Sequence, residues 1–214
     1  MSRIALATVL ILSPALLCAA DFRAGAEAYM DADYEEAYVE LKPLASGGDG
    51  YAQYLIANMY ANGYGVTENA KESLKWLELA ASNGIADAQY ALGNAYARAD
   101  RDKDALAFYR LAAEQGQADA QAMLGMKYEL GDSVAEDDAE AAKWFELAAE
   151  QGNRDAQFNL GYMYAMGNGV APDYEAALSW YGRAAKQGDL EAQSKLALMY
   201  SKGQGVPQSN VTAH

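Results

Sequence analysis

One helical motif recurs five times along this 214-residue chain, and it constrains the fold more than any other feature. Each copy begins with Ala-Gln and continues with an aliphatic residue four positions after the alanine, a small residue next to it, and a tyrosine three positions later. These spacings place the shared positions on one side of an α-helix. The copies begin at Ala52, Ala88, Ala120, Ala156 and Ala192, at intervals of 36, 32, 36 and 36 residues. A period of this length predicts stacked helical repeats.

A turn and a second helical pattern complete each repeat. The turn reads Gly-x-Gly-Val from Gly63, Gly167 and Gly203 and Gly-Asp-Ser-Val from Gly131, whereas the second repeat is four residues shorter and lacks it. The second pattern carries an aromatic residue, two adjacent alanines and a glycine suited to the positive φ that ends a helix. The aromatic residues and closing glycines are Trp76 and Gly84, Phe108 and Gly116, Trp144 and Gly152, and Trp180 and Gly188. Residues 50–206 therefore predict four full helix pairs and the first helix of a fifth.

Both flanks of this array depart from the pattern. Residues 21–49 predict a degenerate N-terminal capping pair of helices, because Ala45 and Gly48 match the second pattern while Glu40 stands where the repeats carry an aromatic residue. Residues 207–214 end where the second helix of the fifth repeat should begin. We expect this segment to be the truncated start of a further helix or a tail, and the chain to be a fragment of a longer array.

The first twenty residues have the pattern of a secretory signal peptide. Arg3 precedes an apolar run too short to span a bilayer, and the small residues Cys18 and Ala20 stand at the two positions that signal peptidase inspects. We expect cleavage after Ala20 and a periplasmic or secreted mature chain with no integral membrane span. The alternative is lipidation at Cys18, which Leu17 disfavours because such signals have a small residue before the cysteine.

The combined pattern resembles the Sel-one-like repeat (SLR) family, which is related to tetratricopeptide repeats. It reads Ala-Gln-x-x-Leu-Gly-x-x-Tyr, then Gly-x-Gly-Val, then Ala-x-x-Trp, an aromatic residue or leucine, and x-x-Ala-Ala-x-x-Gly, over about residues 50–206. The resemblance implies an all-α fold, a right-handed α-solenoid of stacked antiparallel helix pairs. It also implies a scaffold or regulator that binds proteins or peptides, often in the bacterial envelope. Stacked helix pairs independently favour an extended concave surface.

The charge balance narrows the choice of partner. The chain carries 30 Asp and Glu against 16 Lys and Arg, a formal net charge of −14. Nucleic-acid binding requires a surplus of basic residues, so we expect no nucleic-acid partner. A basic protein or peptide would be attracted by long-range steering that weakens as salt rises. None of these patterns constrains the oligomeric state.

Side chains suited to catalysis or metal binding are scarce. The single histidine is His214, the last residue, and the single cysteine, Cys18, lies in the predicted signal peptide. A nucleophile–histidine–carboxylate arrangement or a histidine–cysteine zinc site is therefore not expected. The acidic run from Glu136 to Glu140 lacks the glycine and alternating oxygen ligands of a calcium loop. We predict no enzymatic activity, no catalytic residues, no cofactor and no metal site.

Most other acidic residues of interest lie near predicted helix starts, where a carboxylate can satisfy free N–H groups. We expect capping by Asp87, Asp119, Asp155 and Glu191 in first helices and by Asp102, Asp138 and Asp173 in second helices.

Positions on the first helices that vary between repeats are candidates for a partner groove. The resemblance to tetratricopeptide repeats places this stripe two residues before the aliphatic position, two after it, and just past the tyrosine. Rings offer apolar contact area, and asparagine amides can pair with an extended backbone. The candidates are Tyr54, Asn58, Tyr90, Asn94, Met126, Glu129, Phe158, Tyr162 and Leu198. The alternative is that these side chains only pack between adjacent first helices.

These observations predict an exported scaffold or regulator in the bacterial cell envelope that binds a partner protein or peptide in the concave groove. Two alternatives stay open. One is a cell-wall-directed enzyme or ligand-binding protein with weak lactam or peptidoglycan activity, and the other is a secreted factor that binds a host protein. The resembling proteins with lactam activity are rich in cysteine, and this chain has neither that feature nor a Ser-x-x-Lys motif.

Overall fold

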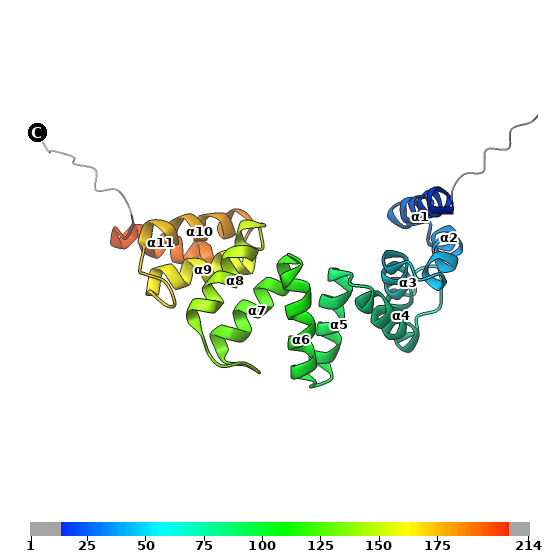
Figure 1. The fold of residues 1–214 in the computed structure, drawn as a ribbon. Helices are drawn as coiled ribbons and strands as arrows, with labels where there is room; N and C mark the ends of the chain where they lie inside the picture. Colours follow the sequence, from blue (N-terminus) through cyan, green and yellow to red (C-terminus); the bar gives the residue numbers. More distant parts are fainter. Residues whose placement is uncertain (1–13, 206–214) are drawn as a thin grey trace, which may run out of the picture. The chain divides into compact units, whose positions relative to one another are not determined.

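The computed structural model describes residues 14–205, with side chains from Phe22 onward. This part of the chain forms eleven α-helices and no strand (Figure 1). They are α1 (Pro14–Met30), α2 (Tyr34–Ser46), α3 (Gly50–Asn62), α4 (Ala70–Ser82), α5 (Ala86–Arg98), α6 (Asp102–Glu114), α7 (Ala118–Leu130), α8 (Asp138–Glu150), α9 (Arg154–Met166), α10 (Tyr174–Lys186) and α11 (Leu190–Lys202). The first thirteen residues of the predicted signal peptide and the predicted tail 207–214 lie outside the described residues.

The chain divides into two compact units, and the division falls inside α5, after Ala88. In the first unit α1 packs on α2, α2 on α3, and α3 on α4. In the second unit each helix from α6 to α11 packs on the next one along the chain. The short connections make consecutive helices antiparallel, so the predicted all-α fold of stacked helix pairs is confirmed.

Each helix pair in the second unit is centred on a glycine that contacts an aromatic ring. A Cβ added at Gly93, Gly125 or Gly161 would lie 2.6–2.9 Å from the ring of Tyr109, Phe145 or Tyr181, respectively. All three rings are fully buried. The rings that fill the core therefore come from the residue after the aromatic position used in the sequence pattern. Trp144 and Trp180, which occupy that patterned position, are only half-buried.

The α1–α2 pair uses the same contact although its sequence is degenerate. A Cβ at Gly25 would lie 2.7 Å from the side chain of Leu41, which is fully buried. Leu41 stands four residues before Ala45, as Leu77 stands four before Ala81. The first helix of this pair, α1, begins at Pro14, before the predicted start of the capping pair at residue 21.

The turn after the first helix of a repeat contacts the backbone at the start of the second helix of the repeat before it. Gly169 has φ 66°, and a Cβ there would lie 2.1 Å from the carbonyl oxygen of Asp138 at the start of α8. Gly65 and Gly205 make the equivalent approach to the carbonyl oxygens of Tyr34 and Tyr174. Ser133 holds this position in the remaining turn with φ 63°. Gly65, Gly169 and Gly205 are required in their turns because a side chain there would overlap the neighbouring backbone.

Part of the capping prediction was wrong, because other side chains cap most of these helices. The side chains that accept the N-terminal N–H bonds of α3, α7, α9 and α11 belong to Asp49, Gln117, Asn153 and Asp189. The predicted caps Asp119, Asp155 and Glu191 lie instead within the first turn, where they face the helix dipole. Asp173 caps α10 as predicted, Asp137 rather than Asp138 caps α8, and α6 has no side-chain cap bond.

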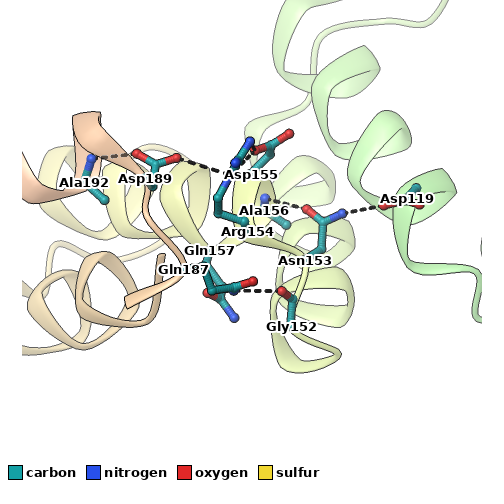
Figure 2. Close-up of polar contacts among 10 residues, drawn as sticks. All are labelled: Asp119, Gly152, Asn153, Arg154, Asp155, Ala156, Gln157, Gln187, Asp189 and Ala192. Atoms are coloured by element: carbon teal, nitrogen blue, oxygen red, sulfur yellow. Dashed lines mark hydrogen bonds and ion pairs between the residues drawn. The ribbon is translucent and has the colours of Figure 1, made fainter. Parts of the chain in front are cut away.

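In three repeats the glutamine of the Ala-Gln pair is bonded to the helix before its own and to the residue that ends the helix after it. Gln157 is buried on α9, its Nε2 donates to the carbonyl oxygen of Ala149 on α8 at 3.0 Å, and its Oε1 accepts from Nε2 of Gln187 at 2.9 Å. Gln187 follows α10 and also donates to the carbonyl oxygen of Gly152 at 2.9 Å (Figure 2). The same pair of bonds is made by Gln53 with Ala45 and Asn83, and by Gln121 with Ala113 and Gln151. We call this series of bonds the glutamine ladder.

The N-terminal ends of neighbouring first helices are also connected. Asn153, the cap of α9, donates through Nδ2 to Asp119 on α7 at 2.8 Å (Figure 2). Arg154 pairs with Asp155 at 2.8 Å and approaches Asp189, the cap of α11, at 3.6 Å. Exposed ion pairs of this kind contribute little energy alone, so they fix helix orientation more than they stabilise the fold.

Candidate partner-binding site

The nine predicted groove residues lie on first helices in both units. Tyr54 and Asn58 are on α3 in the first unit, and the other seven are on α5, α7, α9 and α11 in the second unit. None of the nine is buried: Met126 is 37% exposed, Leu198 is 47% exposed, and the others are half-buried. The aliphatic positions beside them, by contrast, are fully buried from the first to the fourth repeat. The stripe is thus the outer layer of the core, with part of each side chain accessible.

Two aromatic members of the stripe contact the buried rings of second helices. The ring centroid of Phe158 lies 5.5 Å from that of Tyr181, and the centroid of Tyr90 lies 6.0 Å from that of Tyr109. These two rings therefore pack on the cores of their helix pairs and are also partly exposed.

One predicted amide is already engaged. The hydroxyl of Tyr109 donates to Oδ1 of Asn94 at 2.8 Å, so the Asn94 oxygen is held by the protein rather than presented to a peptide. Burial raises the pKa of Tyr109 to about 12, which keeps this hydroxyl a donor at neutral pH.

Glu129 is the single acidic member of the stripe. Its side chain is half-buried on α7, and burial, followed by the negative charge of Asp138, raises the pKa of its carboxyl group. A partner group that contacts Glu129 is therefore more favourable if it is positively charged or neutral than if it is negatively charged.

A pocket of about 180 Å³ lies between α9, α10 and α11 and includes two of the predicted residues, Tyr162 and Leu198. It is lined by Tyr162, Ala165, Met166, Tyr174, Tyr181, Lys195, Leu198, Met199, Lys202 and Gln204. The ammonium of Lys195 lies 5.8 Å from the centroid of the Tyr162 ring. Small-molecule and side-chain sites are typically concave, mostly apolar and equipped with a few polar groups, as this one is.

The two lysines of this pocket were not among the predicted residues. A signal was present in the repeats, because Lys195 replaces the uncharged residues Leu55, Ala91, Met123 and Asn159 of the other copies. Lys202 lies seven residues further along the same helix, and only the packing of α11 on α10 brings both lysines to one pocket.

The acidic run from Glu136 to Glu140 lies at the start of α8. Asp137 caps α8 and Glu140 pairs with Lys143 at 2.7 Å, so part of the acidic run from Glu136 to Glu140 serves the helix start. Within residues 14–205 no group of three or more histidine, cysteine or acidic side chains could hold a metal ion. In the same range, no helix has the length and apolar character needed to cross a membrane.

One family model, described as the Sel1 repeat, matches the chain. It matches five times, at residues 50–85, 86–117, 118–153, 154–189 and 190–214. The matched segments cover most of the chain and coincide with the helix pairs from α3 onward. The α1–α2 pair is not matched, although it shares the glycine contact of the repeats.

Two solved structures resemble this one closely. A Sel1 repeat protein from Oxalobacter formigenes is 38% identical with a TM-score of 0.74, over 78% of this chain and 49% of that protein. The protein c5321, described as a protective antigen present in uropathogenic Escherichia coli strains and displaying an SLR fold, is 34% identical with a TM-score of 0.80. That match covers 90% of this chain and 43% of c5321. This chain therefore spans about half the length, or less, of these two proteins.

A more distant structure shares the fold alone. It is a putative Sel1 repeat protein from Klebsiella pneumoniae, 21% identical with a TM-score of 0.51, over 86% of this chain and 93% of that one. No curated protein matches the chain.

Proposed function

The chain belongs to the Sel1 repeat family, whose members generally act as protein–protein interaction scaffolds, and we propose that it is a non-enzymatic scaffold of this kind. Its binding surface is the partly exposed face of the first helices in the second unit. Phe158, Tyr162 and Leu198 are central to this surface.

One observation carries the proposal. Two residues of the predicted stripe, Tyr162 and Leu198, line the pocket between α9, α10 and α11. Surfaces that bind protein segments combine accessible aromatic or aliphatic anchors with a concavity that excludes water, and this face has both.

Export to the cell envelope is part of the proposal. It rests on the signal-like pattern of Met1–Ala20 and on the similarity to c5321, which is described as a protective antigen. The net charge of −14 favours a partner with basic surfaces, which would associate faster at low salt than at high salt.

The test is affinity capture from an envelope extract with the immobilised full chain, followed by identification of the bound protein. A Met126→Ser/Leu198→Ser variant removes the two most exposed apolar residues of the stripe. The matched control is Leu111→Ser/Leu147→Ser, because these leucines are 46% and 45% exposed but lie on the second helices α6 and α8.

We expect the same partner to be retained by the control and lost by the stripe variant, with equal helical circular dichroism for all three proteins. Loss in the control and retention in the stripe variant would assign binding to the opposite face and contradict the proposal.

A further inference from the structure

Two tyrosine rings lie stacked where the turn after α3 meets the start of α2. The rings of Tyr34 and Tyr64 are nearly parallel, with 7° between their planes and 4.3 Å between their centroids. The other ring contacts of residues 22–205 are tilted or edge-on. Parallel rings matter for chemistry as well as packing, because two phenol radicals can form a bond only where the π orbitals of their rings overlap.

The backbone keeps these two rings together. Gly65, the residue after Tyr64, has φ 64° and approaches α2 so closely that an added Cβ would lie 2.4 Å from the carbonyl oxygen of Tyr34. The two side chains therefore leave the backbone at neighbouring points, although they are far apart in the sequence. Reactants that are held in position in this way react much faster than reactants that must meet by diffusion.

A third ring supports the stack from the side. The ring of Tyr29 lies 5.5 Å from that of Tyr34 at an angle of 70°, and 6.5 Å from that of Tyr64 at 65°. Edge-on rings of this kind attract each other and hold their positions. Their π orbitals point in different directions, so Tyr29 positions the stacked pair without competing for a bond to either ring.

The stacked pair is also accessible to a small oxidant. The side chain of Tyr64 is 36% exposed, and that of Tyr34 is half-buried. An electron can therefore leave the pair to a molecule in solution, and water can accept the phenol protons.

We propose that Tyr34 and Tyr64 are a site of oxidative cross-linking, where two equivalents of a one-electron oxidant join the rings as dityrosine. Each phenol loses one electron to the oxidant and one proton to water, which gives two phenoxyl radicals. A carbon–carbon bond then forms between the two ring positions that adjoin the hydroxyl-bearing carbons. The hydrogen atoms on those two carbons move to the phenol oxygens, so the chain loses two hydrogen atoms in all. The inference does not depend on the scaffold function.

The stacked pair is particular to the first repeat. At the corresponding positions, the turn after α9 and the helix start that it contacts have Asn168 and Asp138, and those of α11 have Gln204 and Tyr174. These turns make the same close backbone approach without two rings. The pair is therefore not needed to build the turn.

Tyr38 and Tyr60 provide an internal comparison. Their hydroxyl groups are hydrogen-bonded at 2.8 Å, but their rings are 89° apart in orientation, with centroids separated by 6.0 Å. Perpendicular rings lack the overlap that the coupling step requires. We therefore expect no cross-link between these two tyrosines.

The test oxidises the full chain at low protein concentration with a photogenerated ruthenium(III) tris-bipyridine complex, which is a one-electron oxidant. We expect a monomeric product that has lost the mass of two hydrogen atoms and has the fluorescence of dityrosine. Proteolysis and mass spectrometry should identify one linked pair of peptides, containing Tyr34 and Tyr64.

Two variants separate this pair from the other tyrosines. Tyr64→Phe keeps the ring but removes the phenol, and it should abolish the product. Tyr60→Phe is the matched control, because it removes a phenol from the perpendicular pair, and it should leave the yield unchanged. The peptide map of the native chain does not depend on how well either variant folds.

Oxidation of the native chain unfolded in urea shows whether the fold directs the reaction, and it should give a mixture of links. Four outcomes would overturn the inference. They are the absence of a link within one chain, a link mapped to another pair such as Tyr38 and Tyr60, an undiminished product from Tyr64→Phe, or the same single link from the unfolded chain.

Discussion

The ring of Tyr181 occupies the space that a side chain at Gly161 would need, since a Cβ there would lie 2.9 Å from the ring. The same relationship joins Gly125 to Phe145 and Gly93 to Tyr109. In the first repeat the two positions are Ala57 and Leu77, so a larger residue on one helix accompanies a smaller one on the other. The size of one residue thus depends on that of its partner across the helix pair.

Gly161→Ala should destabilise the protein by about 1–3 kcal/mol, because the added methyl group overpacks a buried ring. The double variant Gly161→Ala/Tyr181→Leu reproduces the pair found in the first repeat and should lose less stability than the two single changes summed. Urea unfolding of the four proteins measures this coupling.

Gly182→Ala is the matched control, because no atom lies within 4 Å of a Cβ at that helical position. It should be neutral or stabilising by up to about 1 kcal/mol, as expected for alanine replacing glycine in a helix. Equal destabilisation by both alanine substitutions would contradict the role assigned to the ring.

Gln157→Ala should cost about 1–3 kcal/mol, because it removes a buried amide that bonds Ala149 and Gln187. Gln187→Ala should cost less, since that side chain is exposed. The two effects should be less than additive because the residues share a bond, and chemical denaturation of the double variant provides the value. Strict additivity would show that the Gln157–Gln187 bond contributes no stability.

Lys127→Met should leave stability unchanged or raise it. Lys127 is a buried lysine paired with Asp132, and it stands where the first, fourth and fifth repeats carry the buried residues Met59, Met163 and Met199. The change removes a charge that is buried at a cost, and the Asp132 side chain that it leaves is 47% exposed to water. Asp132→Ala should instead cost about 1–2 kcal/mol, because it leaves the buried ammonium group without its partner. The thermal unfolding temperatures of the two variants measure this difference. A large loss of stability in Lys127→Met would contradict the view that the buried lysine contributes little to stability.

This pair also makes stability depend on pH. The hydrogen bond from Lys127 lowers the pKa of Asp132 below its ordinary value. A lowered pKa in the folded state gives stability that is present above the unfolded pKa, near 3.9, and is lost as pH falls through the folded value. The native chain should therefore lose more stability on acidification than Lys127→Met does, as acid titration followed by circular dichroism would measure.

Ser133→Gly should stabilise the protein by about 0.5–1 kcal/mol, because serine at φ 63° is in a region that only glycine adopts without cost. The matched control is Ser179→Gly, an exposed helical position on α10 where glycine should cost about 1 kcal/mol. The two changes in unfolding free energy should have opposite signs.

The repeat pattern predicted the helix pairs well because hydrophobic spacing and helix-ending glycines are local features. Gly84, Gly116, Gly152 and Gly188 follow the second helices with positive φ, as expected. The capping prediction failed by a few residues in the first helices, because the alanine of Ala-Gln is the third residue of its helix and not the first. Acceptors such as Asp49 and Asn153 lie three residues before that alanine, the distance an N-cap requires.

The candidate site was predictable in position but not in chemistry. The resemblance to tetratricopeptide repeats, supported by variation between the repeats, indicated Tyr162 and Leu198, which lie on one face of the first helices. Lys202 lines the pocket because α11 packs against its neighbouring helices. The hydrogen bond from Tyr109 to Asn94 likewise depends on contact between two helices. Neither relationship has a periodic signature in the chain.

The glutamine ladder affects which insertions and deletions a repeat chain can accept during evolution. Each rung is made between positions that the repeats share, so a duplicated or deleted repeat would bring the same donors to the same acceptors. Recombination in whole repeats would thus keep every buried amide paired. A single residue inserted within a helix would rotate the following glutamine away from both partners, and growth by small insertions would be blocked there.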